Sequence, residues 1–389
     1  MLTGDIPLSV PELGGNEWKY VKEGIDSGWV SSVGPFVTRF ETELAQYVGS
    51  RHAVAMVNGT AALHIALQVI GVEPNDEVLV SNLTFIAPVN AIRYCQAHPV
   101  LMDVHPETWQ MDSSKVAKFL EEGCEVRGAQ CFNRSTGRRV RAILPVHILG
   151  LSCEIDRIVE VARRHHLYVV EDAAEGMGVR YRRQHVGTFG DVGVFSFNGN
   201  KIMTAGGGGM LVTDDAEKAE CARYLSTQAK DDPIESVHNC IGYNYRLSNV
   251  QACIGVAQLE QLDTFITKKR AIAKTYETAF RDLPQVCVMP CPPETEPTCW
   301  LYTILLGEKM RLGDRKVVIQ DLRRRGVGAR PLWHTIHNLR PYRDCYAYRI
   351  EYSMALYERG ISLPSSVGLS QNDLNVCVEA VQDAVRGLA

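Results

Sequence analysis

Residues 167–175 read LYVVEDAAE and give the strongest indication of how this chain folds. An apolar run that ends in acidic residues predicts a strand buried on both faces, which is typical of parallel sheets. Similar runs, many of them separated by helical segments, predict further strands at residues 53–57, 78–80, 98–103, 142–146, 192–197 and 209–213. This alternation predicts an α/β fold with a mostly parallel mixed sheet between helices.

The last third of the chain mixes strands and helices and predicts a second, smaller unit. A long helix is expected from residue 248 into the 270s, and a strand at residues 300–306. We expect a large domain at residues 1–265, with its N-terminal arm near the ligand-binding edge of the sheet. A small C-terminal α/β domain is expected at residues 266–389.

Composition and charge exclude several classes of partner. The chain has 389 residues, 46% of them hydrophobic, and a net charge of -4, so nothing calls for nucleic acid or an anionic membrane. Residues 1–5 lack the pattern of a signal peptide, and the apolar run at 61–72 is too short to span a bilayer. The 12 cysteines are irregularly spaced, which favours free thiols in a cytoplasmic protein.

A lysine follows the predicted strand at 192–197. The run FSFNGNK ends at Lys201, and four glycines follow at 206–209. Glycines let the backbone approach a flat ligand without Cβ clashes. Asp172 ends the neighbouring strand, where α/β sheets present ligand-binding groups.

An amine, an anion for a ring nitrogen and neutral donors for a phosphate are what pyridoxal 5'-phosphate requires. We therefore predict this cofactor, with Lys201 as the catalytic amine and proton carrier. Asp172 is predicted to be the partner of the ring nitrogen, although an N-cap role for its side chain is the simpler alternative. Glu171 should point to the opposite face of the same strand.

Other candidate contacts are individually weak. Gly59, Thr60 and Ala61 form a strand-to-helix turn whose N–H groups and helix dipole suit a phosphate. Ser196 adds a hydroxyl at another strand end, and Phe85 could stack on the cofactor ring. His147 ends the strand at 142–146 and could face the site or be a structural histidine.

Together these segments resemble the DegT/DnrJ/EryC1/StrS family of sugar-nucleotide aminotransferases, which have the fold type I pyridoxal-phosphate architecture. The resemblance rests on NGTAAL at 58–63, EDAAE at 171–175, FSFNGNK at 195–201 and GYNYRL at 242–247, and extends over nearly the whole chain. It implies that Lys201 forms a Schiff base with the cofactor.

The resemblance also implies roles for further residues. Asn244 would reach the cofactor phosphate of the other subunit, which makes a homodimer the expected unit. Glu175 stands where relatives carry Gln or His near the phenolic oxygen, so its carboxyl group would have to be protonated or turned aside. The implied substrate contacts are Trp29, Arg330, Trp333 and His334. His334 and His337 lack an acidic or Cys partner, so no metal site is expected.

The FNGNKI form of the lysine loop is similar to the LegC-like enzymes that aminate UDP-linked 4-keto-6-deoxy-N-acetylhexosamines at C4. The resulting expectation is an aminotransferase of bacterial amino-sugar biosynthesis, with L-glutamate as donor. The alternative is a C3- or C4-aminotransferase of a dTDP- or GDP-keto-sugar. A non-catalytic cofactor-binding regulator is more remote, and Lys201 argues against a dehydratase of the same fold. A nicotinamide-dependent dehydrogenase is disfavoured because no Gly-x-Gly-x-x-Gly follows the first strand.

Overall fold

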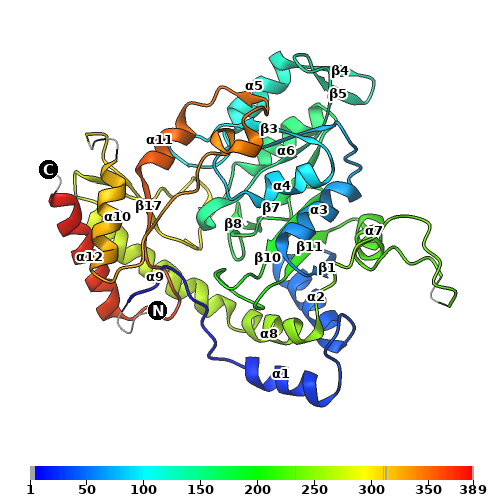
Figure 1. The fold of residues 1–389 in the computed structure, drawn as a ribbon, viewed down its shortest axis with the longest axis horizontal. Coiled ribbons are helices and arrows are strands. Elements are labelled where there is room, and N and C mark those ends of the chain that lie inside the picture. The colour runs from blue at the N-terminus through cyan, green and yellow to red at the C-terminus, as the bar shows by residue number, and fades with distance from the viewer. Residues whose placement is uncertain (1–4, 233, 310, 312, 388–389) are drawn as a thin grey trace.

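The computed structural model describes residues 5–232, 234–309, 311 and 313–387 (Figure 1). A ten-stranded sheet lies at the centre of the larger part of the molecule. Its main path runs β1 (His52–Met56), β11 (Gly209–Thr213), β10 (Val192–Ser196), β7 (Tyr168–Asp172), β6 (Arg139–Leu144), β2 (Glu77–Ser81), β3 (His98–Met102) and β16 (Ala347–Tyr348). Neighbours from β10 to β16 are parallel, whereas β11 is antiparallel to β1 and β10. The predicted α/β fold with a mostly parallel mixed sheet is confirmed.

A hairpin that the sequence analysis did not predict extends this sheet. It comprises β4 (Cys124–Arg127) and β5 (Gln130–Asn133), and β5 pairs antiparallel with β6. In β5 the buried residues alternate with more exposed ones, and in β4 only Cys124 is buried, so the hairpin has no continuous apolar run. Continuous apolar runs predict strands that are buried on both faces, so they do not predict this hairpin.

Helices pack along the sheet and carry the chain between its strands. The first part of the chain contains α1 (Glu17–Asp26), α2 (Pro35–Val48), α3 (Gly59–Val69), α4 (Ala87–Tyr94), α5 (Ser113–Gly123), α6 (Ile155–Arg164), α7 (Ala216–Ser226) and α8 (Asn249–Leu259). α3 packs on β10 and β11, and α6 packs on β6 and β7. Because α3 begins directly after β1, its N-terminus lies at the edge where β7 and β10 end.

The C-terminal part forms a separate antiparallel sheet with its own helices. The strand order is β12 (Val286–Cys287), β14 (Thr303–Leu306), β17 (Gly360–Ser362) and β15 (Arg330–Pro331). Its helices are α9 (Leu262–Phe280), α10 (Asp314–Arg324), α11 (Tyr352–Arg359) and α12 (Gln371–Arg386). Short elements complete the chain, namely β13 (Thr295–Glu296), β8 (Arg180–Tyr181), β9 (Gln184–His185) and the 3-10 turns at 148–150, 336–338 and 340–342.

Two expectations for this region need correction. The long helix expected from residue 248 is divided into α8 and α9 at Glu260 and Gln261. Both side chains at the break form hydrogen bonds with α1, since Glu260 accepts from Tyr20 and Gln261 donates to Glu17. The strand expected at 300–306 begins only at Thr303. The domain boundary after residue 265 falls inside α9 and stays a prediction.

The two parts of the molecule are linked by more than α9. The N-terminal segment follows the C-terminal part, where Ile6 bridges Val327 and the Ser365 N–H donates to the Leu8 carbonyl at 2.8 Å (Figure 1). In the other direction, β16 adds residues 347–348 to the edge of the large sheet beside β3. The described helices include none that is long and apolar enough to cross a membrane.

Candidate active site

A cavity of about 480 Å³ lies where the carboxyl ends of β7 and β10 meet the N-terminus of α3 and the C-terminal part. Most of the residues predicted from the sequence line it, namely Gly59, Thr60, Phe85, Asp172, Glu175, Ser196, Lys201, Arg330 and Trp333. A hollow of about 570 Å³ beside Tyr168 and Asp191 contains none of the predicted residues. The chemistry therefore belongs to the first cavity.

Lys201 reaches the cavity from the loop that follows β10. Its side chain is 14% exposed, and its Nζ lies 3.2 Å from Glu175 Oε1. The glycines that follow are required by the backbone, because Gly206 and Gly208 adopt φ of 74° and 128°. A Cβ on Gly209 would lie 2.5 Å from the Asn58 backbone, so only glycine lets this loop pack against the start of α3.

Asp172 ends β7 and is buried at the cavity. Its Oδ1 accepts the Ala174 N–H at 3.0 Å. The residues that follow form a turn, so Asp172 does not have the helix N-cap role that was the simpler alternative. Burial raises the pKa of Asp172 to about 6, although the Ala174 N–H and the charge of Lys201 act against the rise. Because burial disfavours the charged form of Asp172, a positively charged N–H group beside it would stabilise the carboxylate.

Glu171 and His147 are buried next to Asp172 but outside the cavity lining. Glu171 accepts N–H groups from Gly187, Phe189 and Gly190 at 2.7–2.8 Å, so its carboxylate is fully engaged. The Cys153 N–H donates to His147 Nδ1, and the proton on Nε2 is donated to Glu171 at 3.0 Å. His147 is therefore a structural histidine, and Glu171 points away from the site as expected.

The start of α3 forms the expected cradle beside Ser196. Asn58 caps the helix by accepting the Ala61 N–H at 2.8 Å. That donor is consequently engaged within the chain, and Ala61 is buried and outside the cavity lining, so the predicted phosphate contact of Ala61 is not supported. A Cβ on Gly59 would lie 3.0 Å from the Ser196 Cβ, so glycine brings the helix N-terminus close to the end of β10. Backbone donors and a hydroxyl thus meet at one point, as an anion requires.

The arrangement fits pyridoxal phosphate. Lys201 supplies the amine, Asp172 the acid for the ring nitrogen, and the start of α3 with Ser196 the phosphate donors. Phe85 lines the same cavity with 55% of its surface exposed, which leaves an aromatic face open for stacking.

The other predicted residues are divided between the cavity and the surface beyond it. Arg330 and Trp333 lie at the cavity. His334 bonds the Thr335 carbonyl and packs against Tyr357, so it is outside the lining. Trp29 is half exposed after α1 and also lies outside it. Asn244 is exposed on the segment before α8, and its contribution to a partner subunit stays a prediction.

Several contacts of the site were missed by sequence reasoning. Trp300 and Leu8 line the cavity although they are far from Lys201 in the chain. Leu149 donates its N–H to Glu175 Oε2 at 2.8 Å from a backbone with φ of 62°. Trp300 stood inside a predicted strand, and Leu149 lay in a loop for which nothing was predicted. Leu8 belongs to the N-terminal arm that was expected near the site, although no role was predicted for the residue itself.

The carboxyl group of Glu175 is turned to Lys201 and to the Leu149 N–H, and its state beside a bound cofactor stays a prediction. Burial raises its pKa, while the Lys201 charge and the Leu149 N–H act in the opposite direction. Glu175→Ala should destabilise the cofactor-free protein by about 1–3 kcal/mol, because it leaves the buried Leu149 N–H without an acceptor.

Glu175→Gln should cost less, since its amide oxygen can still accept from Leu149. Urea unfolding of both cofactor-free variants tests this order. Equal losses of stability would show that the Leu149 contact is not what Glu175 contributes.

Comparison with known proteins supports the same chemistry. Residues 11–382 match the model of the DegT/DnrJ/EryC1/StrS aminotransferase family. The GDP-perosamine synthase of Caulobacter vibrioides is 39% identical over 381 residues, which are 98% of each chain. The GDP-perosamine synthase of Escherichia coli O157:H7 is 36% identical over 97% of this chain and 98% of that one. The solved structure of the aminotransferase TlmJ from Streptoalloteichus hindustanus superposes with a TM-score of 0.89 at 27% identity, over 99% of this chain and 100% of the other.

Proposed function

Because the chain belongs to the DegT/DnrJ/EryC1/StrS aminotransferase family, and is thus a pyridoxal-phosphate-dependent sugar aminotransferase, we propose that it aminates the C4 ketone of a GDP-linked keto-sugar. L-glutamate is the proposed amino donor, and the product enters amino-sugar biosynthesis. One observation carries the choice of nucleotide. GDP-perosamine synthases of two organisms are 39% and 36% identical to this chain over almost its whole length.

This proposal replaces the UDP-linked N-acetylhexosamine expected from the lysine loop with the GDP alternative. The structure supplies a reason for the change. The FNGNKI run surrounds Lys201 at the end of β10, where it would meet the cofactor. Residues that contact the cofactor carry little information about a nucleotide base bound further out. The loop therefore indicates the family more reliably than the substrate.

Several residues of the cavity have a proposed task. When bound, pyridoxal phosphate supplies an electron sink and a carrier for the amino group. Asp172 holds the proton of the ring nitrogen at the end of β7. Lys201 would attach the cofactor and, when its amine is free, would move a proton between the substrate carbon and the cofactor in each half-reaction. Ser196 and the start of α3 hold the phosphate.

The opening of the cavity provides groups for the rest of the sugar nucleotide. Arg330 is exposed on β15, and its guanidinium can bind a diphosphate through two parallel hydrogen bonds. Trp333 can pack on the sugar or the base. Binding energy from these distant groups would orient the ketone at Lys201. A cytoplasmic homodimer, in which Asn244 reaches the partner's cofactor phosphate, completes the proposal.

A panel of GDP-, dTDP- and UDP-linked 4-keto-6-deoxy sugars, each supplied with L-glutamate, tests the substrate. Mass spectrometry of the products should show amination of the GDP-sugar with kcat/KM at least about tenfold above the other two. The Lys201→Ala variant is the control and should yield no amine with any of them. Preference for a UDP-sugar would reinstate the reading based on the lysine loop.

A further inference from the structure

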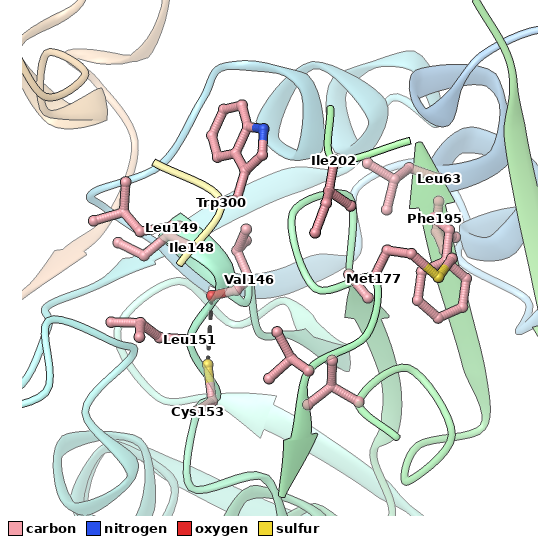
Figure 2. Packing of buried hydrophobic residues seen from close by; sticks show 14 of the residues in the cluster. Leu63, Val146, Ile148, Leu149, Leu151, Cys153, Met177, Phe195, Ile202 and Trp300 are labelled. Atoms are coloured by element: carbon pink, nitrogen blue, oxygen red, sulfur yellow. Dashed lines mark hydrogen bonds between the residues drawn. The ribbon is translucent and has the colours of Figure 1, made fainter. Parts of the chain in front are cut away.

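Trp300 is a cavity residue without an assigned task. It lies in the turn before β14, is 3% exposed, and lines the cavity together with Lys201. Figure 2 shows its indole in the same packed cluster as Val146 and Ile202, the residue after the lysine. A large aromatic side chain from the C-terminal part is thus placed against the lysine loop.

The indole ring faces the amine of Lys201. The Lys201 Nζ lies 4.3 Å from the ring centroid, well within the range of a cation–π contact. Glu175 Oε1 lies 3.2 Å from the same nitrogen. The free amine therefore has two partners, a carboxyl group and an aromatic face.

Hydrogen bonds hold Trp300 in this position at both ends. Its indole N–H donates to the carbonyl of Asn200, the residue before the lysine, at 2.8 Å. Its own carbonyl accepts from Lys269 Nζ at 2.8 Å, and Lys269 also donates to the Ser365 carbonyl. Lys269 is 2% exposed, and its burial lowers its pKa to about 7. The buried amine of Lys269, which donates to both carbonyls, fixes the backbone of Trp300 to α9.

We propose that Trp300 is a positioning residue that holds the Lys201 amine in place whenever that amine is not attached to the cofactor. This inference rests on the proposed role of Lys201. A lysine side chain has several rotatable bonds, and an amine that is released and must return reacts faster when its position is restricted. The ring face restricts it without forming a bond that would have to be broken chemically.

Trp300→Leu removes both the ring and the N–H donor, whereas Trp300→Phe keeps a ring. Pyridoxal phosphate is added to the cofactor-free proteins, and the rate at which visible absorbance develops is recorded. That rate and kcat should each fall about tenfold in Trp300→Leu and about threefold in Trp300→Phe, the range of one cation–π contact. KM for the sugar nucleotide should not change. Trp109→Phe is the matched control, because Trp109 is also 3% exposed but outside the cavity, and it should behave as the wild type.

The outcomes separate this inference from the proposed function. A wild-type protein that develops no absorbance would remove the role of Lys201, and the inference with it. If the wild type develops absorbance and both Trp300 variants develop it at the wild-type rate, the inference alone is overturned. If Trp300→Leu does not fold, Trp300→Phe decides, because a threefold slower rate than in Trp109→Phe supports the inference and an equal rate contradicts it.

Discussion

Lys201→Ala is expected to lower kcat by about 10⁴-fold or more and to leave the fold intact. The variant loses both the point of covalent attachment and the group that moves the proton, and positioned proton transfer alone is worth about 10²–10⁴. The side chain lies in a cavity and not in the core, so unfolding by urea should change little. Amine formation on the sugar nucleotide, followed by mass spectrometry, measures the loss.

Lys201→Arg is the matched variant. It keeps a positive charge beside Glu175 and Trp300 but cannot attach the cofactor in the same way. It should therefore be as inactive as Lys201→Ala. Substantial turnover by Lys201→Arg would show that charge, and not the amine, is what the reaction needs at this position.

Asp172→Asn is expected to have the second largest effect, a fall in kcat of about 10²–10⁴ with the cofactor still bound. An amide cannot carry the negative charge that keeps the ring nitrogen protonated. The cavity shape and the bond from the Ala174 N–H should survive, because the amide oxygen can accept it. Steady-state kinetics at saturating cofactor measures this loss.

The same variant should change how stability depends on pH. Burial raises the pKa of Asp172 to about 6, above the ordinary 3.8. The folded protein therefore binds the proton more tightly than the unfolded chain. The stability that this contributes is complete below about pH 4 and is lost as the pH rises through 6, by about 3 kcal/mol.

Cofactor-free Asp172→Asn lacks this loss, so it should be more stable than the wild type at pH 7 and similar to it near pH 4. Urea unfolding of both proteins across this range tests the sign. If the free energy of unfolding depends on pH in the same way in both proteins, the carboxyl group of Asp172 is not destabilised by burial.

Local sequence patterns predicted the sheet and the part of the site that belongs to it. Continuous apolar runs marked β7 and β10, and Asp172, Ser196 and Lys201 follow directly from where those strands end. Parallel strands present their carboxyl ends at one edge, so these residues were expected to meet. The glycine run was predictive for the same reason, because backbone proximity selects the residue type.

Contacts between distant parts of the chain could not be predicted in this way. Trp300 reaches Lys201 only because Lys269 and the Asn200 carbonyl fix it there. Glu175 was expected to be protonated or turned aside, and its contact with the Leu149 N–H depends on a left-handed turn that the sequence does not announce. The residues at the break between α8 and α9 likewise bond to side chains of α1. Each depends on tertiary packing.

The attachment of the cofactor to Lys201 is the central claim, and it can be measured directly. Cofactor-loaded protein is reduced with borohydride to make the bond permanent, digested with trypsin and analysed by mass spectrometry. The account predicts that the added mass lies on Lys201, and that it disappears in Lys201→Ala. Attachment to another lysine, such as the buried Lys269, or to none, would contradict the account.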